Sequence, residues 1–263
     1  MSLSATARDA EVAGHDAAPF DLPAKVAATP LRSHPFDHIY MEDVFSPAQY
    51  RRMMEAMPAT SSFHELRHRD AVRPDGKSTR FRLYLYPEDM VFLPAKQRKV
   101  WSEISRVLLS RELQDVFKRK FRRALEERFG KSIDKLNFYP IPILVRDMPG
   151  YRISVHSDAM TKAMTIQFYL PRDVSQKRIG TIFHEADRGE GFDRTTTMGF
   201  MPATGYAFAV TKQKSWHSVA TTTDEDGERN SLMLTYYVQE DSRKWWRWRW
   251  HRVKTFFGHP PSH

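Results

Sequence analysis

The spacing of apolar residues predicts helix in the middle of the chain. Between residues 94 and 129, apolar side chains recur mostly three or four positions apart, as they do on one face of a helix. Gly130 is well placed to end this region, because glycine adopts the left-handed conformation that often follows a helix. We expect a break near Ser110, which divides the region into two helices.

The chain before this region predicts a strand, a shorter helix and a loop. A short apolar alternation in residues 34–45 indicates a strand. Ser46 and Pro47 then supply a helix cap and a proline at the first helical position, and the helix continues to about residue 57. Residues 61–80 are polar and rich in turn-forming residues, so we expect a loop there.

From Lys135 onward the apolar segments become short and rich in β-branched or aromatic residues, with Gly, Pro and Asp clusters between them. The predicted strands are residues 138–146, 165–170, 181–184, 205–211 and 231–238. This spacing favours an antiparallel sandwich or barrel over βαβ units. The fold class is therefore predicted to be α+β, with helices in the N-terminal half supporting a β-rich C-terminal half.

The same patterns divide the chain into three parts. Residues 1–35 are rich in Ala, Asp and Pro without sustained periodicity, and we expect a flexible leader. Residues 36–240 form the folded domain, and residues 241–263 form a basic, aromatic tail. No internal repeat of 20–50 residues is evident.

Composition narrows the chemistry. The 263-residue chain is 41% hydrophobic, enough for a sizeable core, and has no cysteine. Disulfides, thiolate zinc sites and cysteine nucleophiles are thereby excluded, so any metal must be held by His and carboxylate. Neither a long apolar run nor a secretory h-region is visible, and we expect a cytoplasmic protein.

Residues 150–158 (GYRISVHSD) contain a candidate metal site. His156 and Asp158 are two positions apart, so their side chains project to the same side of an extended strand. His217, beside bulky neighbours in residues 215–219, is the preferred third ligand. Two His and one carboxylate with open positions suit Fe(II) in oxygenases. Taken alone, a His-x-Asp pair is more often coincidence in a chain with 11 histidines.

Arg229 strengthens the metal hypothesis, because it opens a strand pattern twelve residues after His217. An Arg-x-Ser pair puts the guanidinium of Arg229 and the hydroxyl of Ser231 on one face, where both can grip a carboxylate. The alternative for Arg229 is a surface ion pair with a nearby acid, and the candidates are Asp224, Asp226 and Glu228. His184 is a rival third ligand, ranked lower because no strand with an arginine follows it.

The order His-x-Asp, His, Arg-x-Ser resembles that of the iron(II)/2-oxoglutarate-dependent dioxygenase superfamily, in its bacterial, prolyl-hydroxylase-like branch. The segments TIQFYLP, GTIFHE and MPATGYAFAVTKQKSWHSV agree with it, and the similarity covers roughly residues 36–240. The resemblance implies a double-stranded β-helix (jelly roll) core with N-terminal supporting helices.

The same resemblance implies the roles of the site residues. Fe(II) would be held by His156, Asp158 and His217, and the C5 carboxylate of 2-oxoglutarate by Arg229 with help from Ser231. With O₂, such enzymes hydroxylate an unactivated C–H bond and release succinate and CO₂. Halogenases of the superfamily replace the carboxylate ligand with a small residue, so the retained Asp158 favours hydroxylation, desaturation or ring formation.

Four further residues are weaker candidates. Gln167 is a candidate for binding 2-oxoglutarate, with a solvated strand face as an equally good interpretation. Arg152 and Lys162 are candidates for attracting an anionic substrate, although such charges are usually solvated at a surface. Tyr151 is a candidate for lining the mouth of the site, with simple packing as the alternative.

The tail carries a basic, aromatic segment. Residues 243–254 hold six Lys or Arg and no acid, which leaves +3 of the net charge of +9 for the rest of the chain. Residues 243–257 suit peripheral contact with an anionic inner-membrane surface, while nucleic acid is disfavoured. The alternative is that the Trp rings cover the domain's own helices.

The leading functional hypothesis is a hydroxylase of a small molecule, a sugar or a lipid-linked substrate. A protein or peptide side-chain hydroxylase is the second enzyme hypothesis. A jelly-roll protein that binds a metal or ligand without redox chemistry is the alternative from another class. A basic nucleic-acid-binding module would explain the tail but would leave the ordered His, Asp, His and Arg set to coincidence.

Overall fold

The structure is a computed structural model that describes residues 20–66, 69–73, 75–185, 194–238 and 250. This part of the chain contains helices and antiparallel strands. The helices are α1 (Leu22–Ala28), α2 (Pro47–Glu55), α3 (Pro87–Met90), α4 (Ala95–Leu108), α5 (Arg111–Lys120) and α6 (Arg122–Phe129). The strands are β1 (His38–Met41), β2 (His64–Glu65), β3 (Arg80–Tyr84), β4 (Phe138–Asp147), β5 (Ile153–Ser157), β6 (Lys162–Tyr169), β7 (Thr181–His184), β8 (Thr195–Met198), β9 (Gly205–Ala209), β10 (Trp216–Val219) and β11 (Arg229–Val238).

Local signals set the helix ends. Ser46 caps α2 in a reciprocal capping box with Gln49, and the Ser110 hydroxyl accepts from the backbone N–H of Leu113 at the start of α5. The predicted break near Ser110 and the end at Gly130, which is left-handed at φ 62°, are confirmed. A second break, between α5 and α6, was not predicted, because apolar spacing continues across it.

The strands form two antiparallel sheets. The larger has seven strands in the order β1-β9-β6-β11-β4-β3-β2, and the smaller has four in the order β5-β10-β7-β8. All five strands predicted after Lys135 are present, as β4, β6, β7, β9 and β11. The predicted combination of helices with an antiparallel β-rich half is therefore confirmed.

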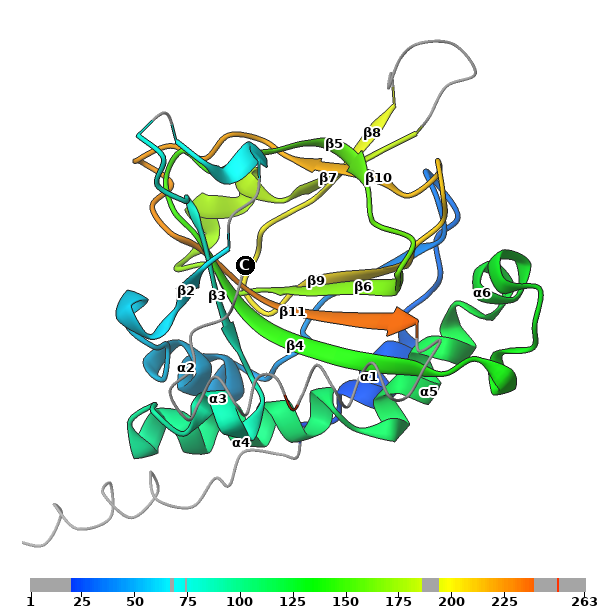
Figure 1. Cartoon of the computed structure of the whole chain (residues 1–263), viewed down its shortest axis with the longest axis horizontal. Helices are drawn as coiled ribbons and strands as arrows, with labels where there is room; N and C mark the ends of the chain where they lie inside the picture. The colour runs from blue at the N-terminus through cyan, green and yellow to red at the C-terminus, as the bar shows by residue number, and fades with distance from the viewer. Residues whose placement is uncertain (1–19, 67–68, 74, 186–193, 239–249, 251–263) are drawn as a thin grey trace, which may run out of the picture.

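The large sheet separates the core from the site. Helices cover one face of this sheet, and the small sheet lies over the other (Figure 1). Ile166 and Phe168 of β6 and Leu232 of β11 are fully buried in the core shared with the helices. The alternate residues, such as Gln167 and Met233, line a pocket between the sheets. β6 and β11 therefore each contribute one face to the core and the other face to the pocket.

Several segments differ from the sequence prediction, among them α1, β2 and β3. Within the predicted leader, α1 packs against α5, with Leu22 and Val26 fully buried, so the leader does not extend to residue 35 as an unstructured segment. Within the predicted loop, β2 is a strand that pairs with β3. β3 also was not predicted, because it is short and its pocket-facing positions are arginines.

No helix among the described residues is long and apolar enough to cross a membrane. The predicted membrane-contact segment, residues 243–257, lies outside the described part of the chain apart from Trp250, which is exposed. Contact between this segment and a membrane therefore stays a prediction.

Candidate metal and carboxylate site

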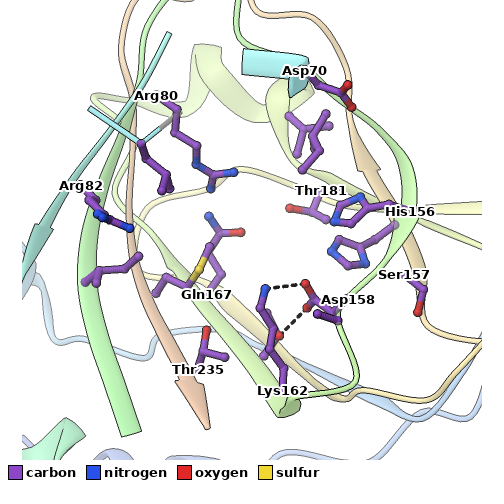
Figure 2. A pocket seen from close by; sticks show the side chains of 18 of the residues that line it. Asp70, Arg80, Arg82, His156, Ser157, Asp158, Lys162, Gln167, Thr181 and Thr235 are labelled. Atoms are coloured by element: carbon purple, nitrogen blue, oxygen red, sulfur yellow. Dashed lines mark hydrogen bonds and ion pairs between the residues drawn. The ribbon is translucent and has the colours of Figure 1, made fainter. Parts of the chain in front are cut away.

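Strand pairing brings the three predicted metal ligands together. His156 of β5 lies directly opposite His217 of β10, and Asp158 follows the end of β5. One potential ligand atom from each residue lies within 4.8 Å of the others. Figure 2 shows His156 and Asp158 on the same wall of the pocket.

Both imidazoles are oriented by backbone carbonyls. Nδ1 of His156 lies 3.0 Å from the Ser154 carbonyl oxygen, and Nδ1 of His217 lies 3.1 Å from that of Ser215. When Nδ1–H donates to these carbonyls, the Nε2 lone pairs are free for a metal. Burial lowers the pKa of His217 to about 4, although the nearby Asp158 opposes this shift. His217 is therefore neutral at pH 7, as metal ligation requires.

Hydrogen bonds hold both oxygens of the Asp158 carboxylate. Lys162 Nζ lies 2.5 Å from Oδ1, and the Thr165 hydroxyl donates to Oδ2 at 2.6 Å. Burial alone raises the pKa of Asp158, but Lys162, His217 and these hydrogen bonds outweigh burial and hold the pKa well below its usual range. The carboxylate is ionised, and Lys162, predicted to bind substrate, forms an ion pair with it.

The donor set fits a divalent transition metal. Two imidazoles and one carboxylate converge from one wall and leave the pocket side open, which is the arrangement that suits Fe(II). His184, the rival ligand, lies opposite Trp216 in the β7–β10 pairing, whereas His217 lies opposite Phe183. Its side chain therefore projects to the other face, where Nε2 lies 2.7 Å from the Ser218 hydroxyl.

A row of three charged side chains crosses the large sheet. Asp147 of β4 is directly opposite both Arg80 of β3 and Arg229 of β11. Its carboxylate lies 2.9 Å from Nη1 of Arg229 and 3.2 Å from Nε of Arg80. Two guanidiniums share one carboxylate, so the row carries an excess positive charge. Neither Arg80 nor Asp147 was predicted.

Arg229 is buried in the pocket wall, so the alternative of a surface ion pair is wrong. Its Nε donates to the Ile179 carbonyl at 2.8 Å, and its Nη2 to the Thr181 hydroxyl at 3.4 Å. The guanidinium also lies over the rings of Tyr169 and Phe200. These contacts hold the guanidinium in one orientation.

Gln167 lies within a buried hydrogen-bond chain, so the alternative of a solvated strand face is wrong. Its amide Nε2 donates to the Ser231 hydroxyl at 2.7 Å, and Oε1 accepts from the Tyr206 hydroxyl at 2.7 Å. The Thr181 hydroxyl in turn lies 3.2 Å from that of Tyr206. Gln167, Tyr206 and Thr181 line the pocket, whereas Ser231 does not. Tyr206 was not predicted, because it lies in an otherwise apolar strand.

The two remaining candidates have different positions. Tyr151 lines the pocket and accepts a 2.7 Å hydrogen bond from Nη1 of Arg80. Burial, opposed by Arg80, raises the pKa of Tyr151 to about 12, so the phenol stays protonated. Arg152 is exposed and is not among the residues that line the pocket.

The pocket has a volume of about 580 Å³ and contains both the metal-binding group and Arg229. This volume falls within the range typical of small-molecule sites. Among the described residues, the lining also includes Arg82, Tyr84, Ile143 and Met233. The alternation of Arg80 and Arg82 in the sequence is a signal that could have indicated a charged strand face here, but it was not used in the prediction.

Solved structures with a similar fold include two prolyl hydroxylases. A Pseudomonas putida prolyl-4-hydroxylase aligns over 82% of this chain and 98% of its own, at 14% identity and a TM-score of 0.51. A Trichoplax adhaerens prolyl hydroxylase, solved with a peptide of hypoxia inducible factor, aligns over 89% of this chain and 94% of its own, at 9% identity and a TM-score of 0.52. No protein-family model and no curated protein sequence matches the chain. The predicted resemblance is thus confirmed at the level of the fold.

Proposed function

We propose that the chain is an Fe(II)- and 2-oxoglutarate-dependent dioxygenase that hydroxylates an unactivated C–H bond of a small-molecule, sugar or lipid-linked substrate. One observation carries the proposal. A two-His, one-carboxylate group and a buried arginine row with excess positive charge line the same pocket. 2-Oxoglutarate needs both features, because it chelates the metal at one end and carries a carboxylate at the other.

The order of the strands supports a double-stranded β-helix core. From β4 to β11, the chain passes back and forth between the two sheets. The large sheet contains β4, β6, β9 and β11 of this segment, and the small sheet contains β5, β7, β8 and β10. Such alternation between two facing sheets is typical of a jelly roll and supports this part of the proposal. The metal-binding group comes from the small sheet, and the arginine row from the large sheet.

His156, Asp158 and His217 would hold the iron, and Arg229 would bind the C5 carboxylate of 2-oxoglutarate. When bound, iron and cosubstrate supply the oxidising chemistry that functionalises a C–H bond, with release of succinate and CO₂. The protein's part is to fix orientation and to exclude water. Thr181 and the protonated Tyr206 present hydroxyl groups beside the guanidinium of Arg229.

The charge of the arginine row matches an incoming carboxylate. Asp147 neutralises one of the two guanidiniums and holds both in place, so one positive charge remains for a ligand. Ser231 would contribute through Gln167, because its hydroxyl is occupied by the Gln167 amide and does not line the pocket. Asp158 keeps the carboxylate position filled, which supports hydroxylation over halogenation.

Absorption spectroscopy tests the proposal. Anaerobic addition of Fe(II) and 2-oxoglutarate should produce a weak visible charge-transfer band, and admission of air should yield succinate. His156→Ala should lose the band and His184→Ala should keep it, because only His156 belongs to the metal-binding group. Absence of both band and succinate in the wild-type chain would refute the proposed activity.

A further inference from the structure

Arg82 differs from the other cations that line the pocket. Arg80 and Arg229 share Asp147, and Lys162 is paired with Asp158. Within the described part of the chain, no carboxylate lies within ion-pair distance of Arg82. Its Nε is buried without a hydrogen-bond partner, and its guanidinium lies 5.0 Å from the centroid of the Tyr84 ring.

Strand alternation places Arg82 beside an apolar row. Arg80, Arg82 and Tyr84 share the pocket face of β3, and Tyr84 lies opposite Ile143 of β4. Ile143 in turn lies opposite Met233 of β11. These three side chains form a continuous apolar row across the sheet, one step along β3 from the Arg82 guanidinium.

The metal-binding group lies on the far side of this row. Met233 is directly opposite Gln167 of β6, and Thr165, two residues before Gln167, donates to Asp158. Figure 2 shows Arg82 and Asp158 on opposite sides of the hollow, with Gln167 between them. A ligand that extends from Arg82 toward the metal-binding group therefore crosses apolar surface.

A buried guanidinium donor without an acceptor is unfavourable, and a ligand that supplies an acceptor removes that cost. Arginine presents paired N–H groups that match the oxygens of a carboxylate or phosphate. Tyr84 holds one face of the Arg82 guanidinium, so its orientation is restricted. The geometry is that of a receptor for an acidic group.

We infer that Arg82 binds the acidic head group of the organic substrate, and that the substrate is a small amphipathic acid whose apolar body lies along Tyr84, Ile143 and Met233. The acid is a carboxylate or a phosphate ester, and the carbon to be oxidised is the end remote from it. The claim that the bound acid is the substrate rests on the proposed function, whereas the acid-binding site itself rests on the geometry of Arg82.

Calorimetry on the full chain tests the inference without turnover. The protein is incubated with Zn(II), which supports no oxidation, and saturating 2-oxoglutarate, so that the Arg229 end is filled. Octanoate, octyl phosphate and octanamide are then titrated. We expect one of the two acids to bind roughly 10- to 100-fold more tightly than the amide. The preferred acid identifies the head group.

Variants assign the preference to Arg82. Arg82→Ala should abolish the discrimination between acid and amide, and Arg82→Lys should retain part of it, since lysine keeps the charge but not the fork. Arg152→Ala is the matched control and should behave as wild type, because Arg152 lies outside the pocket. Circular dichroism melts confirm that each variant is folded.

Three results would overturn the inference. They are no binding of either acid, equal binding of acid and amide, and a loss of 2-oxoglutarate affinity in Arg82→Ala, which would place Arg82 in the cosubstrate site. Failure of the proposed function is distinguishable, because it appears as absence of the Fe(II) band while Arg82-dependent acid binding persists in a titration without 2-oxoglutarate.

Discussion

His156 and His217 are directly opposite one another in the β5–β10 pair, with ring centroids 4.2 Å apart, although they are far apart in the sequence. The register departs from regular pairing immediately after His217, between His217 and Val219. The position of a metal ligand in this chain is therefore a consequence of strand register. A slip of one residue would turn one imidazole to the other face of the sheet.

The hydroxyl of Thr165 should contribute to metal affinity, because it holds Oδ2 of Asp158. Thr165→Val keeps the side-chain shape and removes the hydrogen bond, and we expect the affinity for Fe(II) to fall roughly tenfold. Anaerobic calorimetry measures the affinity for Fe(II). Thr235→Val, a change at another pocket threonine outside the metal-binding group, should leave the affinity unchanged. Equal losses in both variants would mean that the hydroxyl has no specific role.

Arg229 should determine cosubstrate affinity but not metal affinity. Arg229→Lys keeps a positive charge and loses the fixed fork that Ile179 and Thr181 orient. We expect the dissociation constant for 2-oxoglutarate to rise roughly 10- to 100-fold, with Fe(II) binding retained. Titration of the visible band with 2-oxoglutarate provides the measurement. Arg178→Lys, at an arginine that pairs with Asp226 outside the pocket, is the control.

Asp147 should be essential for stability, because it is buried between two guanidiniums. Asp147→Asn leaves both Arg80 and Arg229 without a counter-charge, and we expect a loss of about 3 kcal/mol in unfolding free energy. Urea unfolding followed by circular dichroism measures the change.

A matched Asp→Asn change at the surface provides the control for Asp147. Asp115 pairs with Arg111 in an exposed i,i+4 arrangement on α5. Asp115→Asn should therefore cost no more than about 0.5 kcal/mol. A similar small effect in Asp147→Asn would show that the arginine row does not need its carboxylate.

His38 should make stability depend on pH. Burial lowers its pKa below 6.5, and Arg32 lowers it further, while the Phe36 carbonyl and Asp37 act in the opposite direction. The unfolded chain then takes up a proton before the folded one, so His38 stabilises the fold fully above about pH 6.5 and this contribution falls as the pH drops below it. Urea unfolding of the metal-free protein between pH 7 and 5 measures the slope.

Substitution at His38 isolates this contribution. His38→Asn should unfold more easily at every pH, because a buried ring is lost, yet with a shallower dependence on pH than wild type. His64→Gln, at an exposed histidine on β2, should keep the wild-type slope. An unchanged slope in His38→Asn would exclude His38 as the source.

Much of the fold was predictable from local pattern. Ser46 and Ser110 mark helix starts through their side-chain caps, and Gly130 marks a helix end through its backbone. Strand alternation correctly placed His156 and Asp158 on one side. The sequence missed β3 and α1, since a short strand with pocket-facing charges and a short helix near the N-terminus carry little periodic signal.

The sequence by itself determined most of the longer helices and strands, and which residue types are available to hold a metal. Only the tertiary structure decided that Asp147 lies between Arg80 and Arg229, that Lys162 pairs with Asp158, and that Arg82 lacks a carboxylate partner among the described residues. The physical reason is the separation along the chain over which each kind of interaction acts. Helix caps and alternation act over a few residues, whereas these contacts depend on sheet register between strands that are distant in the chain.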